Sequence, residues 1–155
     1  MTRFYNSTFD PWLIVLQIVV MQSLFYCSMG FFLFFFGFLL GVPIFLEQIF
    51  SAGAVGLNDA PSVVVLLAFT FTSITCAIFL VTVVERAKKC LDFAATIHLF
   101  HFLGCLVYAG FPTAWLWWLL MLFSLLCMTM LGEYLCWRQE MKEIPIRSVA
   151  HVLEV

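Results

Sequence analysis

Four long apolar runs dominate the sequence and lie at about residues 12–39, 61–84, 91–108 and 113–137. A helix needs about 20 apolar residues to cross the hydrocarbon core of a bilayer, and each run is close to that length or longer. Across the chain 65% of the residues are hydrophobic and only 10% are charged, unlike a soluble domain. Lipid offers the backbone no hydrogen-bond partner, so such runs cross it as helices. The sequence therefore predicts an all-α polytopic membrane protein, in which residues 1–155 form one four-transmembrane-helix bundle.

The basic residues predict how this bundle is oriented. Arg86, Lys88 and Lys89 lie between the second and third runs, three more basic residues follow the fourth run, and Arg3 precedes the first. The other two loops contain none. Because the cytosolic loops of membrane proteins carry the excess of Lys and Arg, the N- and C-termini and the basic hairpin are expected in the cytosol. An even number of crossings agrees with this placement.

Both ends of the chain carry features that depend on this orientation. The sequon Asn6-Ser7-Thr8 would stay unglycosylated on the cytosolic side. Residues 138–155 begin with alternating charges and contain Pro145, a residue that helices tolerate poorly. They are expected to form a mobile cytosolic tail, in which the charged start makes one or two helical turns that stop at the proline.

Polar and small side chains within the runs predict which faces pack inside the bundle. Gln17 and Gln22 need polar partners, so the N-terminal half of the first run is expected to be its better packed half. The phenylalanine-rich block at 31–38 is expected to face lipid. A stripe of small residues recurs at four-residue intervals in the second run, at Ala68, Thr72 and Cys76. Small residues let another helix approach closely, so this stripe predicts a helix contact.

The segment between the first two runs, residues 41–60, contains Pro43 and several glycines. Within it the apolar residues between Ile44 and Phe50 have a spacing compatible with a helix. We expect a short segment that lies in the membrane surface. Pro61 then opens the second run.

His98 and His101 are three residues apart in the third run and project to one side of a helix. Three interpretations are open: hydrogen bonds between helices, which we favour, a zinc site, or proton handling. A stable zinc site needs three or four protein ligands, and the remaining histidine, His151, lies in the tail. Cys105 and Glu133 would have to complete such a site. No metal or cofactor site is therefore predicted.

Asp92 and Glu133 lie at similar depth near the cytosolic ends of the third and fourth runs. Asp92 falls in the first turn of its helix, where negative charge is favoured. Ion pairs with the neighbouring basic residues would satisfy both carboxylates. Because no nucleophile, phosphate-binding loop or ligand triad accompanies them, no enzymatic activity is predicted.

The six cysteines do not suggest a disulfide framework, because neither loop expected on the luminal side contains one. Four of them lie inside apolar runs and are interpreted as small packing residues, namely Cys27, Cys76, Cys105 and Cys127. Cys90 and Cys136 lie at the ends of runs beside basic clusters. Reversible palmitoylation is one alternative for this pair.

A series of short strings runs through most of the chain in a characteristic order. It comprises Asp10-Pro11, Gln17, Met21-Gln22 and Tyr26, then Lys89 to Phe93 with His98, Phe100 and His101, then Gly104-Cys105, Phe111-Pro112, Trp117-Trp118, Gly132 to Cys136 and Glu140 to Pro145. In this order the strings resemble the Sys family of Golgi integral membrane proteins, small four-span proteins of the trans-Golgi. The loop at 41–60, the phenylalanine block and the residues after Pro145 depart from the family pattern.

The resemblance implies a receptor in the trans-Golgi network membrane that recruits an ADP-ribosylation-factor-related (ARF-related) small GTPase through the acetylated N-terminus of the GTPase. Protein and vesicle trafficking between the trans-Golgi and endosomes would depend on it. Six residues are expected to border the groove that accepts this segment, namely Asp92, Glu133, Tyr134, Arg86, Lys88 and Lys89. The alternative function is a small transporter or proton-handling protein that uses His98 and His101. Nucleic acid is not an expected partner, and the sequence leaves the oligomeric state open.

Overall fold

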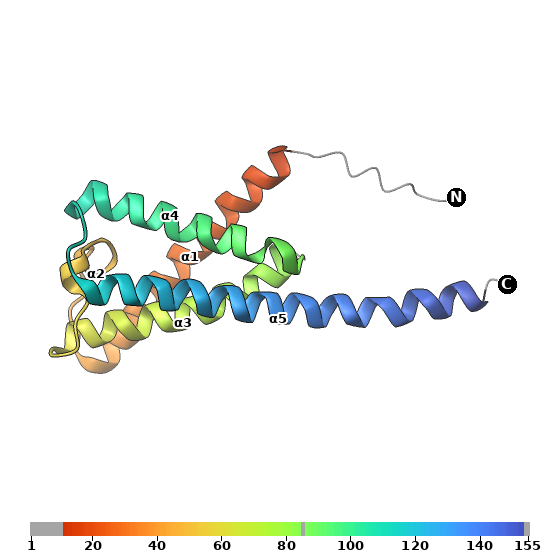
Figure 1. The fold of residues 1–155 in the computed structure, drawn as a ribbon. Coiled ribbons are helices and arrows are strands. Elements are labelled where there is room, and N and C mark those ends of the chain that lie inside the picture. Colours follow the sequence, from red (N-terminus) through yellow and green to blue (C-terminus); the bar gives the residue numbers. More distant parts are fainter. Residues whose placement is uncertain (1–10, 85, 154–155) are drawn as a thin grey trace.

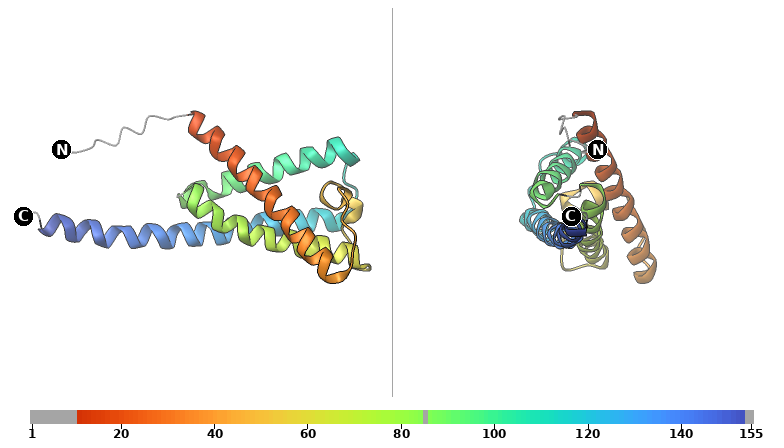
Figure 2. Two further views of the ribbon diagram at one scale, coloured as in Figure 1. Left: turned by 180° about the vertical axis from the view of Figure 1, so that it is seen from behind. Right: turned by 90° about the vertical axis from the view of Figure 1, so that its right-hand side faces the viewer.

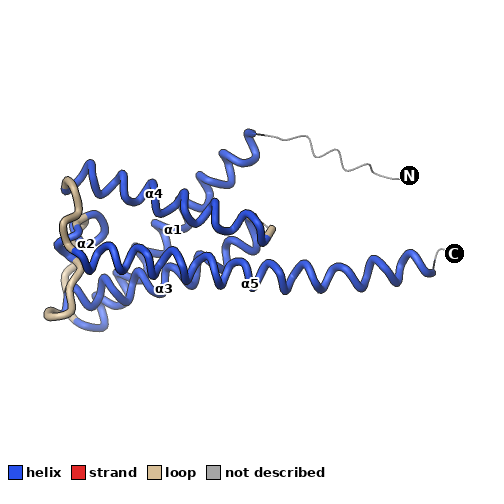
Figure 3. Tube along the Cα trace, in the orientation of Figure 1, coloured by secondary structure: helices blue, strands red, loops and turns tan. Residues whose placement is uncertain are grey.

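The computed structural model describes residues 11–84 and 86–153, with side chains described as far as Met141. Arg3 and the sequon at Asn6 lie outside the described residues. The elements are α1 (Pro11–Leu40), α2 (Glu47–Phe50), the 3-10 turn η1 (Ala52–Ala54), α3 (Ala60–Val83), the 3-10 turn η2 (Ala87–Lys89), α4 (Cys90–Ala109) and α5 (Trp115–Leu153) (Figure 1). Figure 3 shows helices and connecting loops, without strands, over these residues.

Four helical segments in the described chain are long and apolar enough to cross a membrane. They are Pro11–Leu40, Ala60–Val83, Ala87–Ala109 and Trp115–Met141. The prediction of an all-α, four-span membrane protein is thereby confirmed.

The four long helices pack as a ring in which each touches two neighbours. α3 packs most extensively against α1 and α5, while α4 contacts α5 and, less extensively, α1. The buried centre of the ring holds Phe25 of α1, Phe69 of α3, His101 of α4 and Ser124 of α5. The small-residue stripe of α3 is part of this interior: Ala68, Thr72 and Cys76 are fully buried, as predicted.

Helix α1 runs obliquely across the other three helices (Figure 2). Its 30 residues span about 45 Å at 1.5 Å per residue, more than the hydrocarbon core of a bilayer needs, and tilting accommodates that excess. The buried residues of α1 run from Met21 to Gly37, and none lies between residues 11 and 20. The expectation that the N-terminal half packs better is therefore wrong, because the tilt carries that half away from the bundle (Figure 1).

The phenylalanine block of α1 divides between lipid and the bundle. Phe31, Phe34 and Phe38 are mostly exposed, as expected of lipid-facing residues. Phe32 and Phe36 instead pack on Phe71 of α3, with ring centroids 5.7 Å and 5.2 Å away. Successive residues of a helix point in different directions, so a continuous run of phenylalanines places some rings toward lipid and others against the bundle.

Both ends of the described chain emerge at the same end of the bundle, where η2 also lies (Figure 1). The turn between α4 and α5 and the short helix α2 lie at the opposite end. This arrangement agrees with an even number of crossings. By the distribution of basic residues, the end with η2 is the cytosolic one.

Helix α5 continues well beyond the bundle toward the C-terminus (Figures 1 and 2). Its 39 residues correspond to about 58 Å at 1.5 Å per residue. The sequence predicted a helix that stops at Pro145, whereas α5 includes Pro145 and ends at Leu153. Pro145 removes one backbone hydrogen bond, yet the helix continues through it.

The short helix α2 closes the luminal end of the ring. Ile44, Phe45 and Leu46 just before it are largely exposed, in keeping with a segment at the membrane surface. Phe50 at its end reaches inward, with its ring stacked on His101 at a centroid distance of 5.9 Å. Gln48 is buried and donates from Nε2 to the carbonyl of Pro43 at 3.1 Å, which fixes the loop.

Local signals determine where the spanning helices begin and end. Asp59 caps α3, since its carboxylate accepts a hydrogen bond from the backbone N–H of Ser62 at 3.3 Å and Pro61 follows in the first turn. Gly41 and Gly110 follow the ends of α1 and α4 with φ of 65° and 83°. Glycine adopts this left-handed backbone without steric cost, so both helices stop there.

Candidate partner-binding surface and polar core

A chain of polar side chains links three helices inside the membrane. His98 of α4 places Nδ1 2.8 Å from the carbonyl oxygen of Ala94 and Nε2 2.9 Å from Oγ of Ser124 on α5. Ser124 in turn contacts the hydroxyl of Ser73 on α3. All three side chains are buried. The chain therefore joins α4, α5 and α3 at a depth where an unsatisfied polar group would be costly.

The partners of His98 fix the direction of these hydrogen bonds. A carbonyl oxygen only accepts, so Nδ1 of His98 donates to Ala94. In neutral imidazole Nε2 then accepts, and the Ser124 hydroxyl donates to it. The one hydroxyl proton of Ser73 has two acceptors within reach, the carbonyl oxygen of Phe69 at 2.8 Å and Oγ of Ser124. Both ring nitrogens of His98 are engaged, which favours a structural tie between helices over proton handling.

His101 lies one turn along α4 in the aromatic centre of the bundle. Its ring centroid is 5.7 Å from that of Phe25 and 5.4 Å from that of Phe69. Nδ1 lies 3.5 Å from the hydroxyl of Tyr26 on α1, and Nε2 lies 3.6 Å from Sγ of Cys105. This histidine thus joins α4 to α1, whereas His98 joins α4 to α5.

The two glutamines of α1 lie in different surroundings. Nε2 of Gln17 donates to the carbonyl oxygen of Val83 at 2.8 Å and so ties α1 to the last turn of α3. Gln22 has a buried Oε1 that accepts no hydrogen bond from the part of the chain that the structure describes. Among the described residues, only Gln17 of this pair makes a side-chain hydrogen bond to another helix.

Cys90 and Cys136 face each other where α4 meets α5. Their sulfur atoms are 3.5 Å apart, and both residues are buried. An acyl transferase needs an accessible thiol, so this position disfavours the palmitoylation considered for the pair. Gly132, one turn before Cys136, lets the helices come this close: a Cβ there would lie 3.0 Å from Cδ1 of Leu80 and 3.7 Å from Sγ of Cys90.

The carboxylate of Glu140 holds the basic hairpin against α5. Its Oε1 accepts a hydrogen bond from the backbone N–H of Ala87 at 3.2 Å, at the first residue of η2. The sequence reasoning missed this contact because 53 residues separate the two groups and nothing in the pattern pairs them. It fixes the hairpin that carries Lys88 and Lys89.

Two grooves open beside this hairpin, and they divide the predicted partner-binding residues. The first, of about 440 Å³, is lined by Ala87, Lys88, Met130, Glu133, Tyr134 and Trp137. The second, of about 300 Å³, lies between α1 and α4 and is lined by Ile14, Ile18, Lys89, Asp92, Phe93 and Thr96. Arg86 is exposed and belongs to neither set.

The six predicted residues thus border two separate grooves rather than one. Asp92 lies on the side of α4 that faces α1, whereas Cys90, two residues earlier, faces α5. Because two residues along a helix correspond to a rotation of about 200°, Asp92 and Cys90 cannot lie on the same face of α4. Neither Asp92 nor Glu133 forms an ion pair with another described residue, in contrast to the local pairing that the sequence suggested. Both carboxylates are exposed.

A metal centre gains no support from the described residues. No three His, Cys, Asp or Glu side chains within residues 11–84 and 86–141 are grouped closely enough to hold an ion. Cys105 approaches His101 but not as part of such a group, and Glu133 lies on the exposed cytosolic side.

Comparison with known proteins gives the family of this chain. Residues 4–146 match the SYS1 family model, described as an integral membrane protein linking to the trans Golgi network. The chain belongs to the SYS1 family. It is therefore an integral, multi-pass protein of the Golgi membrane at the trans-Golgi network, as the resemblance predicted.

Similar proteins occur in distant eukaryotes. The chain is 36% identical to a SYS1 homolog of Nematostella vectensis over 94% of its own length and 92% of that protein. It is 36% identical to a SYS1 homolog of Dictyostelium discoideum, covering 92% of this chain and 61% of the relative. With Protein SYS1 of Saccharomyces cerevisiae it shares 28% identity, over 88% of this chain and 68% of that protein. No solved structure matches the chain.

Proposed function

We propose that this SYS1 family protein is a non-enzymatic receptor that recruits an ARF-related small GTPase to the trans-Golgi network. Protein and vesicle trafficking between the trans-Golgi and endosomes would depend on this recruitment. The observation that carries the proposal is the groove between η2 and α5, at the end of the bundle that the basic residues assign to the cytosol. The groove combines an apolar floor with charges of both signs.

The lining of this groove suits the start of an amphipathic segment. Met130, Tyr134 and Trp137 offer apolar and aromatic surface, while Lys88 and Glu133 offer one charge of each sign. Its volume of about 440 Å³ is that of a ligand pocket, so it would take the first residues of a peptide rather than a whole helix. An acetylated N-terminus carries no charge and fits such a floor.

A receptor that resides in one membrane can direct a small GTPase to that membrane. One amphipathic segment binds lipid weakly and reversibly, and it binds any membrane of similar composition. A protein groove at the membrane surface adds a second contact, and the two together give a much higher effective affinity. The long C-terminal part of α5 gives the receptor further surface on the same side of the membrane (Figure 1).

We therefore assign Glu133, Tyr134 and Lys88 to the proposed acceptor groove. Asp92 and Lys89 border the second groove, and Arg86 lies exposed on the hairpin between them. Of the six residues that the sequence predicted, three are therefore proposed to contact the GTPase and three are not.

The test compares two single charge reversals in cells that lack the endogenous protein. Glu133→Lys should release the GTPase from the Golgi while the variant itself stays there, as seen by imaging both proteins. Asp92→Lys is the matched control, because it reverses a carboxylate at similar depth in the other groove. Recruitment that survives Glu133→Lys and Tyr134→Ala together would refute the groove.

A further inference from the structure

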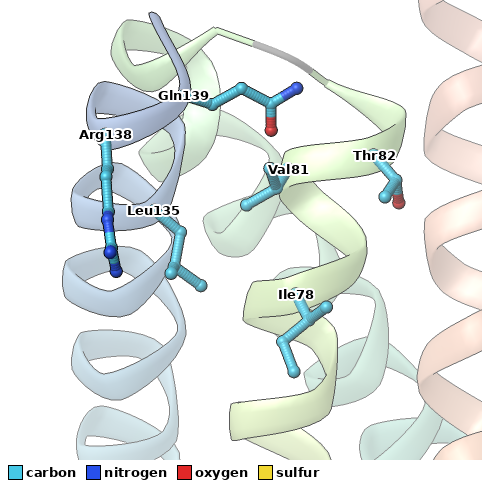
Figure 4. Close-up of a pocket in the computed structure, with 6 residues that line it drawn as sticks. All are labelled: Ile78, Val81, Thr82, Leu135, Arg138 and Gln139. Atoms are coloured by element: carbon cyan, nitrogen blue, oxygen red, sulfur yellow. The ribbon is translucent and has the colours of Figure 1, made fainter. Parts of the chain in front are cut away.

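A third groove opens at the cytosolic end of the bundle, between α3 and α5, and it differs from the other two in charge. It has a volume of about 510 Å³ and is lined by Ile78, Val81, Thr82, Leu135, Arg138 and Gln139 (Figure 4). Arg138 is its only charged lining residue. Each of the other two grooves pairs a lysine with a carboxylate. This groove alone of the three is therefore net positive.

Polar and apolar lining residues are separated along the membrane normal. Thr82, Arg138 and Gln139 lie toward the cytosolic end, just before α3 ends at Val83 and the apolar part of α5 ends at Met141. Ile78 and Leu135 lie about one turn deeper. The groove is thus polar at the depth of lipid headgroups and aliphatic at the depth of the upper acyl chains.

The side chains leave the guanidinium group available. Arg138 runs back along α5 toward Leu135, while Gln139 reaches across the top of the groove toward α3 (Figure 4). Within the described chain Arg138 makes no ion pair. The nearby Glu140 is already bonded to the backbone of Ala87 at 3.2 Å. The hydroxyl of Thr82 donates within α3 to the carbonyl of Phe79, so within residues 11–84 and 86–141 the unpaired side-chain donors of the groove are those of Arg138 and Gln139.

We propose that this groove binds an anionic phospholipid of the cytosolic leaflet. Arg138 would bind the headgroup anion through two parallel N–H groups, at the phosphate and at the carboxylate that phosphatidylserine carries and phosphatidylcholine lacks, and the Gln139 amide would add a third donor. One acyl chain would lie along Ile78, Val81 and Leu135. Basic pockets between spanning helices on the cytosolic side are suited to anionic headgroups, and a lipid is present at this depth in any membrane that holds the protein. The site is separate from the groove proposed for the GTPase.

The experiment measures lipid retention by the full-length protein. The purified protein is equilibrated in mixed micelles with equal amounts of phosphatidylserine and phosphatidylcholine, and native mass spectrometry gives the ratio of the two bound lipids. The wild-type protein should prefer phosphatidylserine. Arg138→Gln should lower that preference roughly tenfold, the loss expected for one charge-assisted hydrogen-bonded contact.

Two further variants separate a built site from a general effect of charge. Lys88→Gln removes a positive charge at the same end of the bundle but in another groove, and it should leave the ratio unchanged. Ile78→Trp fills the aliphatic part of the groove while keeping the arginine, and it should lower phosphatidylserine retention. Equal losses in Arg138→Gln and Lys88→Gln, or no preference in the wild-type protein, would overturn the proposal.

Discussion

Nε2 of His98 on α4 lies 2.9 Å from Oγ of Ser124 on α5, deep within the bundle. Ser124 also contacts Ser73 of α3, so one imidazole organises three of the four spanning helices. Helices in lipid gain little from hydrophobic burial against one another, and contacts of this kind help to determine which faces meet.

Replacement of His98 by alanine should destabilise the folded bundle by about 1–3 kcal/mol, since it leaves the buried hydroxyl of Ser124 without its acceptor. Thermal unfolding in detergent, followed by tryptophan fluorescence, measures the change. Leu99→Ala is the matched control, because Leu99 is 56% exposed to the surroundings of the bundle and adjoins His98. An unchanged midpoint for His98→Ala would show that the polar chain contributes nothing.

Gly132→Val should also destabilise the protein, in this case by overpacking. A Cβ at this position would already lie 3.0 Å from Cδ1 of Leu80, so the larger side chain should cost about 1–3 kcal/mol. Gly30→Val serves as control, because a Cβ at Gly30 meets nothing within 4 Å. If the two variants unfold at the same temperature, α3 and α5 do not approach as closely as described.

The thiols of Cys90 and Cys136 should resist modification in the folded protein. Variants with a single cysteine, treated with N-ethylmaleimide in mild detergent, should react much faster at Arg86→Cys, exposed on the cytosolic hairpin, than at the buried Cys136. Denaturant should remove the difference, since the protection comes from burial between α4 and α5. Acyl exchange on protein from cells should detect no palmitate at Cys90 or Cys136, and efficient acylation there would contradict this packing.

The orientation can be tested through glycosylation. With the hairpin and termini in the cytosol, Asn6 should carry no sugar although it lies in a sequon. A glycosylation tag inserted after Gly53, in the loop at the opposite end, should be modified and provides the positive control. A glycan on Asn6, detected as a shift in gel mobility that a glycosidase removes, would show that the N-terminus lies in the lumen and that the orientation is the opposite one.

Local rules predicted a large part of the fold. The lengths of the apolar runs predicted four spans, and α3 and α4 begin and end within one residue of the predicted bounds. Asp59, Gly41 and Gly110 mark helix ends through capping and a left-handed backbone, which depend on a few neighbouring residues. The same reasoning failed at Pro145, since α5 continues through it to Leu153.

The candidate site was less predictable than the fold. The sequence identified Asp92, Glu133, Tyr134 and the three basic residues of the hairpin as one group, since all lie near the same membrane surface. Their division between two grooves depends on the rotation of α4, which turns Cys90 toward α5 and Asp92 toward α1. The groove at Arg138 was not predicted, because Ile78 and Val81 on its other side belong to α3 and the sequence does not show that α3 lies beside this part of α5.

The order of amino acids was therefore enough to predict four membrane crossings, the end of the bundle that carries the positive charge and the family. The contact of His98 with Ser124, the contact of Cys90 with Cys136 and the oblique path of α1 became known from the three-dimensional structure. The reason is physical. A lipid-facing surface is as apolar as the interior of the bundle, so the hydrophobic pattern that reveals the buried face of a soluble helix is missing here.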